Sequence, residues 1–242
     1  MSKLLLLLSI SFINLYALEY INLGKFKNDS SIFEQKDIEK LSRKFLGVKY
    51  ISNTLSNHKI NTSKENLIIN FDALDCFTFI DTIEALKNSK DLKNFKTKLI
   101  YTRYKNGKIS YHARNHFFSD WVKSNSMEDI TCDLGICEKD IKYLNENEKY
   151  LKQIPTVKRV ISYIKPKHID LSQLKNGDYI GIYTKNKALD VTHTGIIIKK
   201  DGKVFIRHAS SKEKKIIDSE LFDYTKNKAG VIIYRSMWFY SK

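Results

Sequence analysis

The sequence has 242 residues, of which 42% are hydrophobic and 29% charged, with only two prolines, and this composition excludes collagen-like and disordered chains. Lysine and arginine number 42 against 27 aspartates and glutamates, and the resulting charge of +15 favours anionic partners such as nucleic acid, phospholipid surfaces or acidic cell-wall material. The basic residues are mostly dispersed lysines without interleaved aromatic side chains, so we expect no nucleic-acid partner.

The N-terminus has the layout of a signal peptide. Lys3 precedes the apolar stretch Leu4 to Ile13, and cleavage after Ala17 would leave Leu18 as the first mature residue. The apolar stretch is too short to cross a bilayer, and no later segment could. A buried N-terminal helix is the alternative. We expect residues 1–17 to be removed, giving a periplasmic or secreted protein without stable membrane insertion.

The first half of the mature chain is predicted to contain helices, loops, one buried strand and one hairpin. The apolar spacing and turn residues predict a helix capped by Ser30 or Ser31 and ending near Gly47, a polar loop over 52–64, a buried strand over 67–71 and a helix over 76–87. The dipeptide Asn106-Gly107 then predicts a hairpin between strands at 99–104 and 109–112.

Three cysteines become informative if the protein is exported, because oxidising compartments pair neighbouring thiols. Cys132 and Cys137 are close enough in the sequence to form a disulfide around a small loop. Half of a metal site is the alternative, although no second pair or nearby histidine completes a ligand set. Cys76 is left over, and such a thiol is either reactive, paired between molecules or an inert buried residue.

The C-terminal third is predicted to be a run of strands over 179–183, 191–199, 204–209 and 231–234, with Asp201-Gly202 as a turn and a short helix over 219–224. Helices followed by antiparallel strands indicate an α+β fold. Neither an internal repeat nor a flexible linker divides the sequence, so we expect residues 18–242 to form a single catalytic domain.

Cys76 is the first candidate for chemistry. It lies where a strand gives way to a helix, and the unpaired N–H groups and dipole at a helix start favour a thiolate. Asp72 and Asp75 are candidate caps of that helix, although the charge of Asp75 would oppose ionisation of its neighbour. A general base is still required.

Two histidines on the predicted C-terminal hairpin could supply that base. With Asp201-Gly202 as the turn, Gly195 lies opposite His208, and His193 and His208 become diagonal neighbours on one face, roughly 7 to 8 Å apart at the backbone. The glycine leaves room for the imidazole ring. This arrangement suits His193 as a base oriented by His208.

Other interpretations of the two histidines remain open. They could be structural residues, or a bulge could send them to opposite faces. They could also bind a metal, with Asp190 or Asp178 as a third ligand, although we expect no metal and no cofactor.

Four motifs carry a resemblance to a known family. They are Phe71-Asp72-Ala73-Leu74-Asp75-Cys76-Phe77-Thr78, Arg114-Asn115-His116-Phe117-Phe118-Ser119-Asp120-Trp121, Leu189-Asp190-Val191-Thr192-His193-Thr194-Gly195 and Arg207-His208-Ala209-Ser210. In this order they resemble the N-acetylmuramoyl-L-alanine amidase-like family, a branch of the NlpC/P60 superfamily of papain-like cysteine hydrolases that act on peptidoglycan. The resemblance covers about residues 33–235.

The resemblance implies a papain-like core in which the helix bearing the nucleophile packs on an antiparallel sheet. It makes Cys76 the nucleophile, His193 the base and His208 the orienting residue. Phe77-Thr78 replaces the Ser-Gly that ordinarily follows Asp-Cys in the superfamily, which fits the amidase-like branch.

Substrate contacts are expected from residues near the second and fourth motifs. Stem-peptide carboxylates need cationic partners, so Arg103, Arg114 and His116 are candidates, together with Asp75 and Ser210. A solvated or structural cation is the alternative for each arginine.

The resulting prediction is a cysteine amidase that separates the muramoyl lactyl group from L-Ala of peptidoglycan or muropeptides. An endopeptidase that cuts within the stem peptide is the first alternative and uses the same three residues. A noncatalytic wall-binding protein, favoured by the positive charge, is the second.

Overall fold

A computed structural model of the chain describes residues 19–55 and 65–237. The predicted signal peptide and most of the predicted loop over 52–64 lie outside the described residues. Within the described part, none of the helices has the length and apolar character needed to cross a membrane.

The order of elements along the chain is mixed. The strands are β1 (Glu19–Asn22), β2 (Lys49–Tyr50), β3 (Leu67–Asn70), β4 (Ala73–Leu74), β5 (Met127–Asp129), β6 (Cys137–Leu144), β7 (Val157–Ile164), β8 (Tyr179–Tyr183), β9 (Val191–Lys200), β10 (Lys203–Ser210), β11 (Lys215–Glu220) and β12 (Gly230–Ser236). The α-helices are α1 (Ile38–Arg43), α2 (Cys76–Lys87), α3 (Leu92–Arg103), α4 (Phe118–Ser124) and α5 (Leu221–Thr225).

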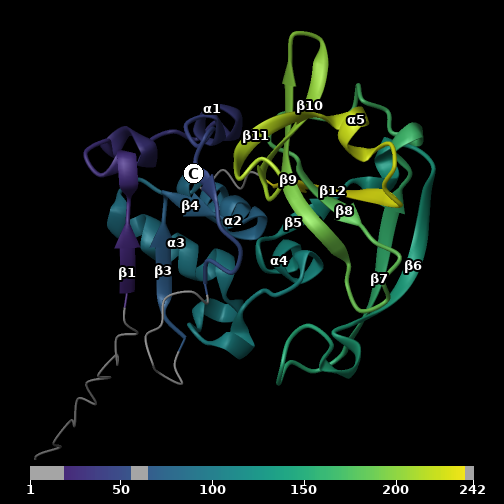
Figure 1. Cartoon of the computed structure of the whole chain (residues 1–242), viewed down its shortest axis with the longest axis horizontal. Coiled ribbons are helices and arrows are strands. Elements are labelled where there is room, and N and C mark those ends of the chain that lie inside the picture. The colour runs from purple at the N-terminus through teal and green to yellow at the C-terminus, as the bar shows by residue number, and fades with distance from the viewer. Residues whose placement is uncertain (1–18, 56–64, 238–242) are drawn as a thin grey trace, which may run out of the picture.

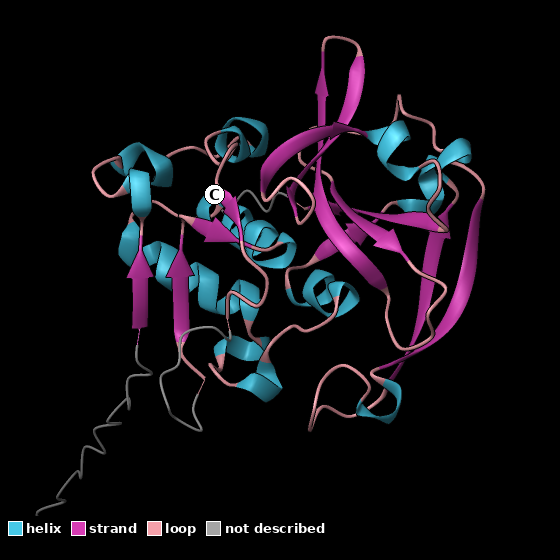
Figure 2. Ribbon diagram, viewed as in Figure 1, coloured by secondary structure: helices cyan, strands magenta, loops and turns pink. Residues whose placement is uncertain are grey.

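Most strands belong to one curled, mixed sheet, with the order β4-β2-β11-β10-β9-β8-β12-β7-β6 and with β5 paired to β12. β2 and β4 run parallel, and the other pairs of this sheet are antiparallel. β1 and β3 form a separate parallel pair. Figure 2 shows the longer helices α2 and α3 on one side of the molecule and the long strands on the other. The α+β class predicted from the sequence is confirmed.

The centre of the sheet is buried on both faces. Along β8, Tyr179 packs into one hydrophobic cluster with α2 and α4, whereas the next residue, Ile180, packs into a second cluster on the opposite face with α5. All five residues of β8 are buried. Burial on both faces requires a continuous apolar strand, which is why Tyr179–Tyr183 shows no polar alternation.

The β9–β10 hairpin has the predicted register. Lys200 pairs with Lys203, and Val204 pairs with Lys199. Asp201 and Gly202 have φ angles of 51° and 72°, and positive φ at both central residues is typical of the two-residue turn that matches strand twist. The pairing places Arg207 opposite Ile196, so the predicted alignment of His208 beside Gly195 is maintained.

The first predicted helix is shorter than expected and is capped by a different residue. Ser30–Phe33 is a separate 3-10 turn capped by Asp29, and α1 begins after Asp37, whose carboxylate accepts from Lys40 N at 3.1 Å. The predicted caps Ser30 and Ser31 are therefore wrong, because the aspartates that precede each turn accept the free N–H groups.

The hairpin predicted around Asn106-Gly107 is also wrong. Asp91 caps α3, and Phe95 and Leu99 point into the core at helical spacing, so the residues predicted as its first strand end a helix. Asn106 and Gly107 do adopt positive φ, at 55° and 67°, but in a single 3-10 turn. The β6–β7 hairpin, in contrast, was not predicted.

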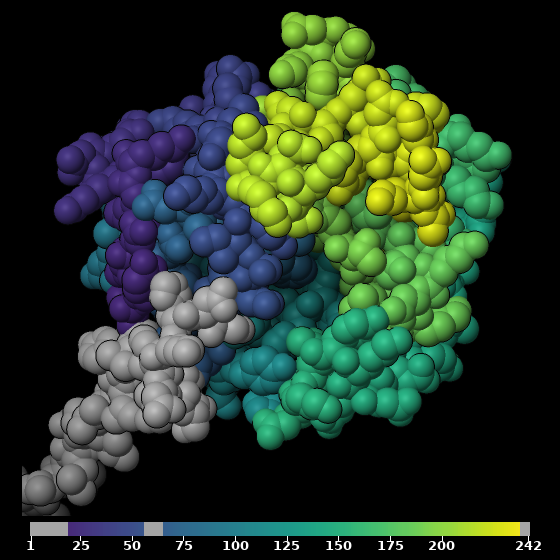
Figure 3. Space-filling model, in the orientation of Figure 1, coloured from purple at the N-terminus to yellow at the C-terminus, as the bar shows by residue number. Residues whose placement is uncertain are grey.

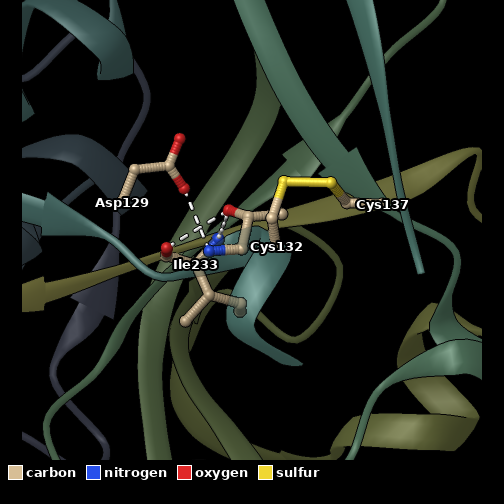
Figure 4. The surroundings of a disulfide bond; sticks show 5 residues. Asp129, Cys132, Cys137 and Ile233 are labelled. Carbon is tan, nitrogen blue, oxygen red and sulfur yellow. Dashed lines mark hydrogen bonds between the residues drawn. A yellow bond between two sulfur atoms is a disulfide. The ribbon is translucent and has the colours of Figure 1, made fainter. Parts of the chain in front are cut away.

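A disulfide joins Cys132 and Cys137, as predicted, with a Cα–Cα distance of 5.1 Å. Figure 4 shows it beside Asp129 and Ile233. The hydroxyl of Thr131 accepts from Ile233 N at 2.9 Å, and Thr131 N donates to Asp129 Oδ1 at 3.0 Å. The disulfide loop is therefore attached to β12 by hydrogen bonds.

Candidate active site

Cys76 is the first residue of α2 and directly follows β4 and the cap Asp75. The Asp75 carboxylate accepts from Phe77 N at 3.1 Å and Thr78 N at 2.8 Å, and the Thr78 hydroxyl accepts from Asp75 N. This reciprocal pair is a capping box and fixes the strand-to-helix turn on which Cys76 lies. Asp75, predicted to bind substrate, has its carboxylate engaged in the cap and by the Thr54 hydroxyl at 2.8 Å.

The thiol of Cys76 is protonated in the free protein at neutral pH. Burial, with a contribution from the charge of Asp75, raises the pKa of Cys76 to about 11. Loss of hydration thus opposes the thiolate that the N–H groups at the helix start favour. Within the described part of the chain, Cys76 is the free cysteine.

A hydrogen bond attaches the start of α2 to strand β9. The Thr194 hydroxyl, which is buried, donates to the carbonyl of Cys76 at 2.9 Å. Thr194 directly follows His193, so this contact brings the strand bearing His193 against the residue that bears the thiol. The threonine of the His-Thr-Gly motif therefore has a structural role at this position.

His193 and His208 are brought together as the register predicts. Nε2 of His193 lies 2.8 Å from Nδ1 of His208, and the ring centroids are 4.9 Å apart in an edge-to-face arrangement. Gly195 also permits close approach of the two strands. A Cβ there would lie 2.7 Å from Ile206 Cγ1 and 2.9 Å from the Arg207 carbonyl.

Two further residues, neither of them predicted from the sequence, complete the histidine cluster. Nε2 of His208 lies 3.1 Å from the Ser219 hydroxyl, and the Tyr224 ring lies 4.7 Å from His208 and 6.0 Å from His193. Ser219 comes from β11, whereas the sequence-based prediction placed it in a helix over 219–224; the helix α5 begins only at Leu221. The chain of contacts therefore runs from Ser219 through His208 to His193.

Both imidazoles are neutral at physiological pH. Burial lowers the pKa of His193 to about 3, with smaller contributions from His208 and Lys228, and burial lowers the pKa of His208 to about 4. A neutral imidazole has one nitrogen free to accept a proton. The cluster can therefore act as a base.

A polar cavity of about 380 Å³ opens beside the histidines and is lined by Thr192, His193, His208, Ser210, Tyr224 and Lys228, among others. Ser210, predicted to contact substrate, is thus at this cavity. Cys76 is not among the residues that line it. Burial raises the pKa of Tyr224 to about 12. Strand β11, which carries Ser219, is lime in Figure 3 and lies over the middle of the face shown. It pairs with the short strand β2 from the N-terminal part of the chain.

Arg103 lies in the interior and not at the cavity. Its side chain is 4% exposed, its Nε donates to Asp81 Oδ2 at 2.9 Å and its Nη1 donates to the Ile68 carbonyl at 2.8 Å. Trp121 Nε1 donates to the other Asp81 oxygen at 2.8 Å. We therefore expect no substrate contact from Arg103, contrary to the sequence-based expectation, because its guanidinium is already paired.

Arg114 and His116 lie together but also have internal partners. Arg114 Nη2 donates to Glu65 at 2.5 Å, and its guanidinium lies 5.5 Å from the Tyr111 ring centroid. His116 Nε2 lies 2.7 Å from the Tyr111 carbonyl, and burial lowers the pKa of His116 to about 4. Neither residue lines the cavity beside His193.

The carboxylates considered as metal ligands are engaged elsewhere. Asp190 accepts from Ser119 N at 2.8 Å at the start of α4, and Asp178 pairs with Arg235 at 2.7 Å. Across residues 19–55 and 65–237, no three His, Cys, Asp or Glu side chains gather as a metal site.

Comparisons with solved structures show proteins of similar fold. An N-acetylmuramoyl-L-alanine amidase from Bacteroides uniformis is 26% identical with a TM-score of 0.72, and the match covers 84% of this chain and 98% of that one. A Bacteroides fragilis protein named as a xylanase candidate is 27% identical with a TM-score of 0.66, over 80% and 98% of the two chains.

A protein from Legionella pneumophila is 26% identical with a TM-score of 0.70, over 86% of this chain and 89% of that one. Comparison with curated proteins finds no match. The model of one family, described as AmiA-like and N-acetylmuramoyl-L-alanine amidase-like, matches residues 40–231. The chain belongs to the N-acetylmuramoyl-L-alanine amidase-like family.

Proposed function

We propose that the protein is a cysteine-dependent N-acetylmuramoyl-L-alanine amidase that hydrolyses the amide between the muramoyl lactyl group and L-Ala of peptidoglycan fragments. The observation that carries this proposal is the chain of contacts from Ser219 through His208 to His193, next to the helix that begins with the free Cys76. Family membership and the papain-like packing of α2 against the sheet that it implies support the same assignment.

His193 is the general base in this proposal. If Nε2 of His193 carries its proton towards Nδ1 of His208, then Nδ1 of His193 is free to accept a proton from the thiol. His208 in turn directs its own N–H towards the Ser219 hydroxyl. Because the resting thiol and both imidazoles are neutral, proton transfer accompanies attack rather than preceding it.

The first half of the reaction forms a thioester. The Cys76 thiol proton moves to His193 as the sulfur bonds to the lactyl carbonyl carbon, and N–H groups at the start of α2 stabilise the oxyanion. The C–N bond then breaks, and His193 returns the proton to the departing amine of L-Ala.

The second half releases the sugar acid. Water attacks the thioester carbonyl while His193 takes its proton, the C–S bond breaks, and the thiol is regenerated by that proton. The products are a lactyl carboxylic acid on the sugar and a free stem peptide, and no cofactor takes part.

We place this reaction outside the cytoplasm. The signal-peptide layout of residues 1–17 and the Cys132–Cys137 disulfide support export to the periplasm or beyond, because disulfides persist in oxidising compartments. Residues 18–242 then act as one catalytic domain. Ser210 at the cavity, with Lys228 nearby, is placed to contact carboxylates of the stem peptide, whereas Arg114 and His116 would need a more extended ligand.

Product analysis tests the proposal directly. Purified muropeptides incubated with the protein are expected to give a free peptide beginning with L-Ala, detected by mass spectrometry, while Cys76→Ala gives none. Shortened peptides on an intact disaccharide would instead establish an endopeptidase, and no turnover by the native protein would leave a wall-binding role.

Xylan serves as a control substrate in the same assay. Glycosidases of the common type need two carboxylates across the scissile bond. Glu213 is the single carboxylate among the described residues that line the cavity, so no release of xylose oligomers is expected.

A further inference from the structure

A second cavity lies at the other end of helix α2, away from Cys76. It has a volume of about 670 Å³ and is lined by residues of α3, α4, β7 and the end of α2. Asn88, which follows α2, is one of the lining residues, and twelve residues at 1.5 Å each place it about 18 Å along the helix from Cys76. This volume is within the range of ligand sites, about 300–1,000 Å³.

The lining of this cavity carries excess positive charge. Its cations are Lys98, Lys105, Lys123 and Arg159. Lys105 and Arg159 share a single carboxylate, Asp120, at 2.9 Å and 2.6 Å. Within residues 19–55 and 65–237, Lys98 and Lys123 have no ion-pair partner, and both are exposed.

The second acidic residue of the lining does not offset these cations. Glu84 is buried, pairs with Lys87 at 2.8 Å and accepts from the Tyr179 hydroxyl at 2.7 Å. Lys87 does not line the cavity, so it neutralises the charge of Glu84 without using one of the lining cations. Three positive charges therefore remain uncompensated around the cavity.

The polar groups between the cations narrow the class of ligand. Asn88, Asn106 and Asn125 contribute amides, and Thr102 and Ser124 contribute hydroxyls. Amides and hydroxyls recognise peptide or sugar groups. The cations are carried by separate side chains of the lining, so carboxylates along a peptide can each approach a lysine or the Arg159 guanidinium.

We propose that this cavity is a second binding site for a carboxylate-bearing peptide or glycopeptide, and that it holds a neighbouring stem peptide of the wall fragment whose amide is cleaved at Cys76. The identity of this ligand rests on the proposed function, whereas the preference for carboxylates rests on the lining residues alone.

Binding to the inactive full-length Cys76→Ala protein tests this site without turnover. Calorimetric titration at low ionic strength would use a disaccharide tetrapeptide and its peptide-cross-linked dimer. Adding Lys98→Gln and Lys123→Gln is expected to weaken binding of the dimer about 5- to 10-fold, as two partly solvated charge contacts are lost, and to change binding of the monomer less than about 2-fold.

The matched control carries Lys93→Gln and Lys152→Gln, which remove two exposed lysines that do not line the cavity. We expect less than about 2-fold change for this control, since screening limits the effect of distant charges. An equal loss in both variants, or a loss in neither, would overturn the site. A glycerol-phosphate oligomer that binds more tightly than the dimer would overturn the carboxylate assignment.

Failure of the amidase proposal has a different signature. It would show as intact muropeptides after incubation with the native protein, whereas failure of the second site would show as equal binding by the two double-lysine variants.

Discussion

Replacing Arg103 with methionine separates a structural role from a substrate contact. Methionine keeps the length of the side chain but removes the charge, and it leaves the Asp81 carboxylate, which is 1% exposed, with the Trp121 N–H as its remaining partner. Removing one partner of a buried ion pair costs about 3–5 kcal/mol. For a chain of 242 residues each kcal/mol corresponds to about 2 °C, so the expected fall in Tm is about 6–10 °C.

The assay combines thermal unfolding at pH 7, followed by circular dichroism, with initial rates on muropeptides at a temperature where the variant stays folded. We expect KM within about 2-fold of the native value, because Arg103 is remote from the cavity beside His193. Arg103→Met combined with Asp81→Asn should recover more than half of the lost Tm, since no unpaired charge remains buried. A Tm change below about 2 °C together with a raised KM would refute this reasoning.

Four other measurements test the site and its scaffold. Because burial raises the pKa of Cys76 to about 11, alkylation of the native protein by iodoacetamide should accelerate steadily from pH 8 to 11, and a rate that is constant from pH 5 to 8 would instead indicate a preformed thiolate. Ser219→Ala is expected to lower kcat about 10-fold with KM unchanged and to be rescued by Ser219→Thr, and an unchanged kcat would remove Ser219 from the positioning of His208. Replacing both Cys132 and Cys137 by serine should lower the free energy of unfolding in urea by about 2 kcal/mol, since the disulfide closes a short loop, and no loss would show that β12 alone holds the segment. His116 has a folded pKa of about 4, below the unfolded value near 6.5, so the unfolded chain binds more protons between these values and stability falls as pH drops through that window. His116→Gln should therefore flatten the decline in unfolding free energy between pH 6.5 and 4.5, and an identical slope would show that the pKa of this histidine is the same in the folded and unfolded chain.

The parts of the site predicted from the sequence were those set by short-range rules. The β9–β10 register followed from a two-residue turn and strict alternation, so the pairing of His193 with His208 could be derived by counting. The start of α2 at Cys76 followed from the cap Asp75. Neither inference required knowledge of a distant segment.

What could not be predicted depends on partners far away in the chain. Asn106 and Gly107 adopt the positive φ that the sequence indicates. The residues before them are nevertheless helical, because the helix buries Leu99 in a core made by distant segments. The internal position of Arg103 depends on Asp81, and the contact of Ser219 with His208 depends on the pairing of β11 with β10. The pKa of Cys76 depends on burial, which spacing does not reveal.

The sheet order has a consequence for when the protein can first become active. β8 lies between β9 and β12, and β12 is the last strand of the chain. A nascent polypeptide thus contains its thiol more than a hundred residues before either histidine is made, and β8, the neighbour of the histidine-bearing strand β9, gains its second partner only when β12 has left the ribosome. Chains interrupted before β12 would leave this edge of β8 unpaired, so incomplete copies are expected not to assemble the complete sheet.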